Sequence, residues 1–104
     1  MTTFMKKIIA ILTQKGALSK GVQENTTVNL FELEDESVKG VESLKLESTE
    51  NNYFSLLMAI KKVSLVYADT INSDLKNILN KIGIKTKCKE DMPSDRFINQ
   101  FIFD

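Results

Sequence analysis

The stretch VSLVYADTINSDLKNILNKIGIKTKC, residues 63–88, constrains the fold more than any other part of the chain. Its apolar ends, Val63–Ala68 and Ile84–Cys88, predict two short strands. The segment between them predicts a helix that is capped by Asn72 or Ser73 and ended by Gly83. Its apolar residues recur with helical spacing at Leu75, Ile78, Leu79 and Ile82. Two strands joined in this way form a parallel pair with a right-handed crossover.

The first half of the chain predicts three more strands and one more helix. Lys6–Thr13 is a nearly continuous apolar run, which is typical of a strand buried on both faces. Thr27–Glu34 and Val38–Glu47 flank a short polar turn and predict an antiparallel hairpin. Ser48 or Thr49 is expected to cap the following helix. Its expected packed stripe is Tyr53, Leu56, Leu57 and Ile60.

A last helix is expected to begin at Pro93 or Ser94, with Phe97, Ile98, Phe101 and Ile102 on one face. The order of elements is therefore β-ββ-α-β-α-β-α. We expect a single α/β domain, residues 1–104, whose mixed five-stranded sheet is covered by helices.

Charge and residue content exclude several functional classes. Lys plus Arg and Asp plus Glu both number 14, so the net charge is zero, and we expect neither nucleic acid nor an anionic membrane as a partner. No apolar stretch approaches the ~20 residues of a membrane span. The apolar start of the chain is interpreted as a strand rather than a signal sequence. One cysteine favours a cytoplasmic protein, and the absence of histidine removes the commonest general base.

Three segments resemble one known family. They are KKIIAILTQ (residues 6–14), the hairpin VNLFELEDESVKGVESLKLE (28–47) and SLVYADTINSDLKNILNKIGIKT (64–86). The family is that of dinitrogenase iron–molybdenum cofactor proteins, with the NifX- and NafY-type carriers and the C-terminal part of NifB. The resemblance implies a ribonuclease-H-like, three-layer fold with a mixed five-stranded sheet. It also implies a non-enzymatic protein that binds iron–sulfur or iron–molybdenum cluster precursors and passes them on.

The chain departs from the family's pattern in three loops. GVQENTT (residues 21–27) stands where the family has a Phe-Gly-Arg-Ala-like run. LESTENN (46–52) lacks the His or Cys that many members carry there, and TIN (70–72) replaces a Gly-Ile-Gly turn. We therefore interpret the chain as a degenerate member that lacks the cluster-ligand motifs.

The first candidate binding site is the turn after Ala68. Ligands of open α/β sheets bind beyond the carboxyl ends of the strands, and the free N–H groups of a helix start favour anions. Asp69, Thr70, Asn72 and Ser73 are therefore predicted to contact a cofactor. The alternative is that Asn72 or Ser73 only caps the helix.

The second candidate site is the loop Gln14–Asn25. Ser19, Lys20 and Asn25 are predicted to contribute to binding of an anion or cofactor. The loop has neither a GxxxxGK[ST] nor a GxGxxG pattern, so a nucleotide is not predicted. The alternative is a plain connecting loop of unusual length.

Cys88 is the weak candidate for a metal ligand. Lys85, Lys87 and Lys89 surround it in the sequence and would favour its thiolate. One thiol cannot hold a cluster, although a homodimer would supply two. The alternative is a cysteine that packs as a small hydrophobe.

Two further functions compete with that of a carrier. A nuclease of this fold needs clustered carboxylates for two metal ions, but the acidic residues crowd the hairpin and Asp69 stands alone, so no enzyme is predicted. An interaction module without small-molecule cargo is the alternative. Its acidic hairpin and its lysine-rich second half would pair in a homodimer or with another protein.

Overall fold

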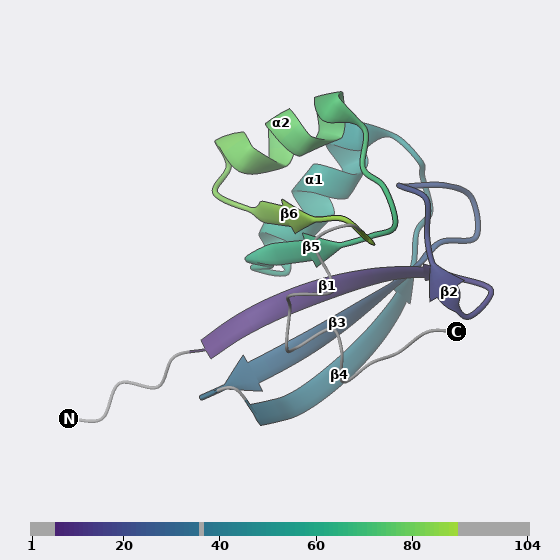
Figure 1. The fold of residues 1–104 in the computed structure, drawn as a ribbon. Coiled ribbons are helices and arrows are strands. Elements are labelled where there is room, and N and C mark those ends of the chain that lie inside the picture. The colour runs from purple at the N-terminus through teal and green to yellow at the C-terminus, as the bar shows by residue number, and fades with distance from the viewer. Residues whose placement is uncertain (1–5, 36, 90–104) are drawn as a thin grey trace.

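The structure, a computed structural model, describes residues 6–35 and 37–89 (Figure 1). Two helices occur there, α1 (Asn51–Ile60) and α2 (Ser73–Lys81). The strands are β1 (Lys6–Gln14), β2 (Ala17–Leu18), β3 (Thr27–Glu34), β4 (Ser37–Lys45), β5 (Leu65–Tyr67) and β6 (Lys85–Lys87).

The strands form one mixed sheet in the order β4-β3-β1-β5-β6, with β2 paired to β1. β1, β3 and β4 are antiparallel neighbours, whereas β1, β5 and β6 run parallel. The predicted parallel β5–α2–β6 unit and the predicted hairpin are therefore confirmed. The single α/β domain and its mixed sheet agree with the expected ribonuclease-H-like fold.

The segment Gln14–Asn25 is not entirely the loop that the sequence predicts, because it contains the short strand β2. Lys15 and Gly16 have φ values of 53° and 81°, and Gln14 pairs with Ala17 across them. Two successive left-handed residues make the tight turn that a two-residue hairpin needs. The chain therefore reverses at once after β1 and forms β2 before it enters the loop.

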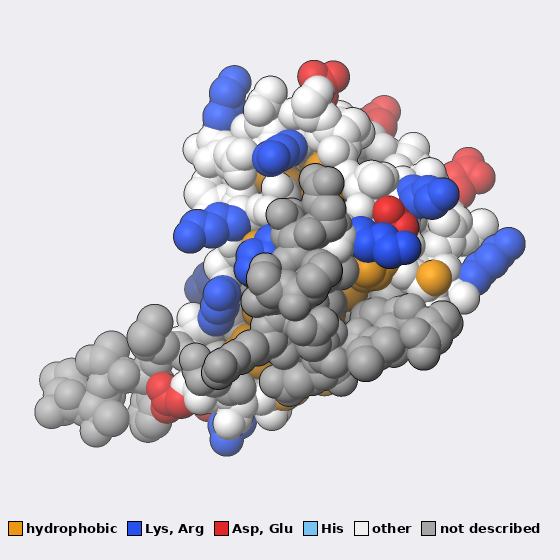
Figure 2. All heavy atoms as spheres, viewed as in Figure 1, with side chains coloured by type: hydrophobic (Ala, Val, Ile, Leu, Met, Phe, Trp, Pro, Cys, Tyr) orange, Lys and Arg blue, Asp and Glu red, His pale blue; other side chains and the backbone are white. Residues whose placement is uncertain are grey.

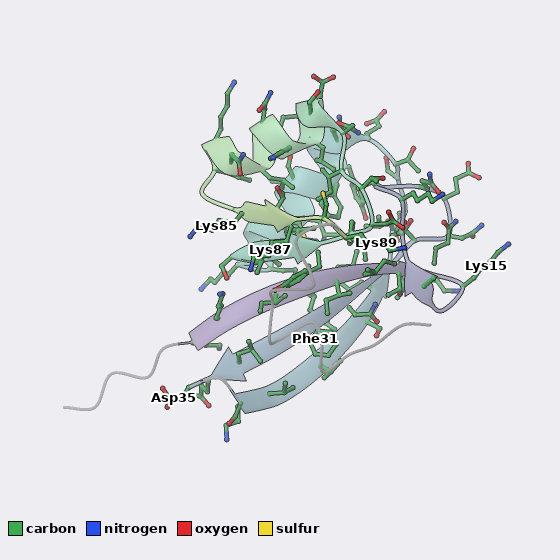
Figure 3. All side chains as sticks on the ribbon, viewed as in Figure 1. Lys15, Phe31, Asp35, Lys85, Lys87 and Lys89 are labelled. Atoms are coloured by element: carbon green, nitrogen blue, oxygen red, sulfur yellow. The ribbon has the colours of Figure 1, made fainter. Side chains whose placement is uncertain are left out.

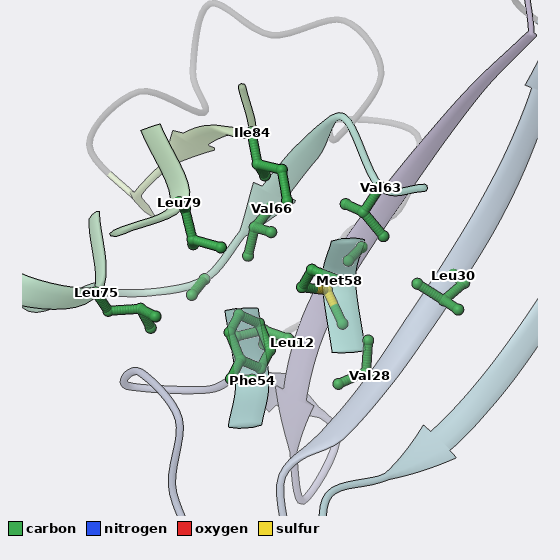
Figure 4. Close-up of a cluster of buried hydrophobic side chains, with 12 residues drawn as sticks. Leu12, Val28, Leu30, Phe54, Met58, Val63, Val66, Leu75, Leu79 and Ile84 are labelled. Carbon is green, nitrogen blue, oxygen red and sulfur yellow. The ribbon is translucent and has the colours of Figure 1, made fainter. Parts of the chain in front are cut away.

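Both helices cover the same face of the sheet (Figure 1). Figure 4 shows the core between them and the strands, in which Phe54 and Met58 of α1 and Leu75 and Leu79 of α2 are completely buried. The strands contribute Ala10, Leu12, Val28, Leu30 and Val66 to this core. The opposite face of the sheet carries a second cluster, formed by Ile9, Ile11, Phe31, Leu33, Leu65 and Tyr67. β1 is thus buried on both faces, as predicted.

Helix α1 differs from its prediction in cap and in buried face. Glu50 is its N-cap and makes no side-chain cap bond, while the Ser48 hydroxyl accepts a hydrogen bond from the Glu50 N–H (3.2 Å) ahead of the helix. Leu56 and Ile60 of the expected packed stripe are 61% and 65% exposed. The core takes a neighbouring stripe built on Phe54 and Met58, while Leu57 of the expected stripe is partly buried against it.

Helix α2 matches its prediction closely. The Asn72 side-chain oxygen accepts from the Leu75 N–H (2.8 Å), and Leu75 and Leu79 are buried. Gly83 has the left-handed φ expected just beyond a helix end, 84°. The expected last helix, from Pro93 or Ser94, lies outside the described residues. Neither described helix has the length and apolar character needed to cross a membrane.

Candidate functional site

The carboxyl ends of three parallel strands meet at one edge of the sheet. At their last paired positions Ile11 lies opposite Tyr67, and Tyr67 lies opposite Lys87. The segments that follow these ends contain every candidate residue from the sequence: Ser19, Lys20, Asn25, Asp69, Thr70, Asn72, Ser73 and Cys88.

Direct backbone contacts join the two predicted binding loops. The Asp69 N–H donates to the Ser19 carbonyl oxygen (2.8 Å), and Lys20 and Thr70 form a parallel β-bridge. Gly21 follows with a φ of 81°, and a Cβ there would lie 3.6 Å from the Thr70 carbonyl oxygen. That distance is an ordinary contact, so the left-handed backbone is the reason for glycine at this position. The structure therefore brings the loops together as one edge.

A pair of buried hydroxyl groups holds the first loop in shape. Ser19 is 1% exposed and Thr26 is 0% exposed, and their hydroxyl oxygens lie 3.1 Å apart. The Gln23 N–H donates to the Thr26 hydroxyl (3.1 Å), and the Ser19 hydroxyl donates to the Gly21 carbonyl oxygen (2.7 Å). The Thr26 hydroxyl is then the donor to Ser19, which satisfies both groups. These bonds give Ser19 a structural role, and a cofactor contact from it stays a prediction.

The third strand end completes the edge. The Lys89 N–H donates to the Asp69 carbonyl oxygen (3.0 Å), and the Ala68 N–H donates to the Lys87 carbonyl oxygen (3.2 Å). Cys88 lies between these two bonds and is partly exposed. Backbone pairing therefore places Cys88 beside the Asp69 turn.

The remaining candidates occupy the start of α2 and the far turn of the loop. Asn72 caps α2, while Ser73 is its first residue and is exposed. Asn25 is exposed, with a left-handed φ of 65° in the Gln23–Thr26 turn. Asparagine tolerates this conformation better than most residues, which accounts for Asn25 without a ligand.

This edge carries both signs of charge. Lys20 and Lys89 are exposed and Asp69 is partly exposed, and Lys89 lies beyond the end of β6 (Figure 3). The Lys87 ammonium lies 5.9 Å from the centre of the Tyr67 ring. Both charge signs are interspersed over the visible face (Figure 2). Two exposed lysines against one carboxylate give the described part of the edge a small positive balance, which favours an anion over a cation.

The described part of the chain offers few side chains that could coordinate a metal ion together. Among residues 6–35 and 37–89, no three His, Cys, Asp or Glu side chains group closely enough to hold a metal ion. A cluster bound at this edge would therefore need Cys88 from more than one chain, or ligands that are not thiolates. Anion binding by backbone N–H groups and lysines needs no such set.

Thr26 and Lys89 contribute to this edge but were not among the candidate binding residues from the sequence. Gly21 lay inside the candidate loop, and a glycine in a polar loop often marks a left-handed backbone. Thr26 had none, since its partner Ser19 is seven residues away and the contact depends on how the loop folds back.

Two comparisons concern the sequence alone, and neither a protein-family model nor a curated protein matches this chain. Solved structures do match. The protein designated PH0822 superposes with a TM-score of 0.67 at 17% identity, over 78% of this chain and 75% of its own. A Methanocaldococcus jannaschii protein (mj0327), provisionally named a dinitrogenase, superposes with a TM-score of 0.60 at 13% identity, over 83% of this chain and 75% of its own. The resemblance to dinitrogenase-related proteins is thus confirmed at the level of fold.

Proposed function

We propose that this protein is a non-enzymatic carrier that binds an anionic cargo, a metal cluster precursor or an anionic cofactor, at the edge formed by residues 19–21, 69–73 and 88–89. The protein would act in the cytoplasm, where its single thiol stays reduced. One observation carries the proposal: the pairing of the Ser19–Gly21 segment with Asp69–Thr70 unites two loops that were each predicted to bind a cofactor.

The fold supports this proposal from a second direction. The structural relatives include a protein whose name refers to dinitrogenase, and open α/β sheets bind their ligands beyond the carboxyl ends of the strands. Lys20 and Lys89 would compensate the charge of an anionic cargo. Cys88 is the residue that could bind iron directly, and a second copy would be needed to supply a second thiolate.

The second candidate function is an interaction module of the same fold without cargo. The absence of a grouped metal-ligand set within the described part of the chain favours it. Under this alternative, the loop edge is a structural end of the sheet, and the hydroxyl pair and the backbone bonds serve only stability.

Anaerobic reconstitution with iron and sulfide tests the carrier. Visible absorption and bound iron per chain are measured for the wild type, for Cys88→Ser and for Lys20→Ala. Lys39→Ala is the matched control, because Lys39 is an exposed lysine on β4 rather than on the loop edge.

The cluster form of the proposal predicts iron in the wild type, loss in Cys88→Ser, reduced loading in Lys20→Ala and no change in Lys39→Ala. Iron retained in Cys88→Ser but lowered in Lys20→Ala would mean cluster docking through charge without the thiolate. If the wild type holds no iron, cluster carriage is wrong, and the interaction module becomes the better account.

A further inference from the structure

Helix α1 exposes a second apolar stripe that its core contacts do not use. Leu56 and Ile60 lie one turn apart, so they share one side of the helix, and both are more than 60% exposed. Phe54 and Met58, on the neighbouring side, already provide the contact with the core. The helix therefore carries more apolar surface than its own domain buries.

Ile60 borders a groove between the end of α1 and the hairpin β3–β4. The groove has a volume of about 400 Å³, and Ile8, Leu30 and Val41 line it with Ile60. Gly40 leaves the groove wider than another residue would. A Cβ at position 40 would lie 3.9 Å from the side chain of Glu32, which also lines the groove. Although Val41 borders the groove, it pairs with Phe31, so its side chain turns to the opposite face of the sheet. The apolar side chains of the groove are therefore Ile8 and Leu30, with the exposed Ile60 as its lip.

The two walls of the groove have opposite charge. Lys61 and Lys62 stand at the end of α1, whereas Glu32 and Glu42 stand on the strands. Lys61 and Glu42 form an ion pair across the groove (3.4 Å), and Lys6 pairs with Glu32 (3.1 Å). Lys62 makes no ion pair with another described residue. A surface with a basic wall, an acidic wall and an apolar lip is complementary to itself.

We propose that this groove and the Leu56–Ile60 stripe form a two-fold interface between two copies of the chain. Each copy places Ile60 against the groove of the other, and Lys62 of each copy faces the acidic wall of the other. A two-fold interface has this reciprocity, since every contact occurs twice. The zero net charge of the chain offers little repulsion between copies. The interface is independent of any cargo at the loop edge.

A second copy fits this surface better than a partner of one charge sign. An acidic peptide would satisfy only the lysine wall, and a basic peptide only the glutamate wall. Pairing through the open edge of β4 is disfavoured, because the register shifts between Glu32 and Leu33 and leaves a bulge at Lys39. Bulges and lysines at a sheet edge are common devices that prevent strand addition.

Sedimentation equilibrium over a range of protein concentrations tests the interface. The wild type is expected to form a reversible dimer, and Ile60→Ser should raise its dissociation constant by about tenfold or more, as the loss of a central apolar contact does. Ile82→Ser is the matched control, since Ile82 is 50% exposed at the end of α2 and does not line the groove. Circular dichroism confirms that both variants remain folded.

Charge reversal tests the reciprocity. Lys62→Glu and Glu42→Lys should each weaken the homodimer, because each places like charges together twice. A mixture of the two variants should form a heterodimer, since both of its charge contacts are then attractive. A wild type that stays monomeric at millimolar concentration, a dimer insensitive to Ile60→Ser, or variants that fail to recover on mixing would each overturn the proposal.

Discussion

Helices α1 and α2 cover the same face of the sheet but bury themselves by different means. α2 has a side-chain cap at Asn72, a glycine beyond its end and one apolar stripe, and it packs through Leu75 and Leu79. α1 begins without a side-chain cap and has apolar residues on more than one side, and the left-handed residue beyond its end is Lys62, with a φ of 60°. Local signals therefore define α2, whereas packing defines α1.

This difference matters for function as well as for folding. A helix with one apolar stripe leaves little apolar surface in solvent once that stripe is packed. At α2, Ile82 just beyond the helix end is the large apolar side chain that stays exposed. A helix with two stripes keeps one for another partner, as α1 does with Leu56 and Ile60. If this contrast holds, the stability of α1 depends on packing alone, whereas that of α2 depends on local signals as well.

The largest effect is expected at the buried stripe of α1. Phe54→Ala should lower the free energy of unfolding by about 3–5 kcal/mol, because Phe54 is completely buried and its loss leaves a cavity. Leu56→Ala should change it by less than about 0.5 kcal/mol, since Leu56 is mostly exposed. Urea unfolding at a concentration where the protein is monomeric measures both. If Phe54→Ala leaves no folded protein, Phe54→Leu provides the graded comparison, and equal losses at 54 and 56 would contradict the assignment.

The second largest difference is expected when the N-cap side chains of the two helices are removed. Asn72→Ala removes the acceptor of the Leu75 N–H and should cost about 1 kcal/mol. Glu50→Ala removes no cap bond, so only its weak interaction with the helix dipole is lost, about 0.3 kcal/mol. The two variants are compared by thermal unfolding in one buffer. A cost at Glu50 equal to that at Asn72 would show that α1 has a local start signal after all.

The helix ends should respond in opposite directions. Gly83→Ala forces a side chain into the left-handed region and should cost about 1 kcal/mol, although no atom would clash with it. Lys62→Gly should instead leave the free energy of unfolding unchanged or raise it by about 0.5 kcal/mol. Lys62 already adopts the left-handed conformation, which glycine adopts without strain. Urea midpoints of the two variants, again at monomer concentration, decide the sign. A loss in Lys62→Gly would mean that the lysine side chain itself stabilises the helix end.

The smallest effect is expected at the ion pair that joins α1 to β4. Lys61 and Glu42 are 34% and 52% exposed, so their attraction is weakened by solvent. Lys61→Ala should cost no more than about 0.5 kcal/mol at low salt and almost nothing at ~0.5 M salt. Unfolding at the two salt concentrations gives the comparison, with Lys39→Ala as a control for the loss of an exposed lysine. A large cost that salt does not reduce would show that the pair is not an ordinary surface contact.

The same contrast explains which parts of the candidate site were predictable. Asp69 and Asn72 were placed correctly, because they follow a strand and precede a helix whose patterns are strong. That the Gln14–Asn25 loop would meet them follows from parallel strands ending at one edge. The buried Ser19–Thr26 pair could not be predicted, since it depends on the turn at Lys15 and Gly16 that forms β2. Nor does the spacing of Cys88 reveal its position beside Asp69, which backbone pairing with β6 provides.

Sequence periodicity, turn residues and caps were sufficient to determine the order of the elements from β1 to β6 apart from β2, the mixed sheet and α2, because these signals act over a few residues. Tertiary structure decided which stripe of α1 is buried, where β2 forms and which hydroxyl groups close the first loop. In each of these cases several local solutions have similar energy, and the choice between them depends on contacts between residues that are distant in the sequence. The exposed stripe of α1 is a product of that choice.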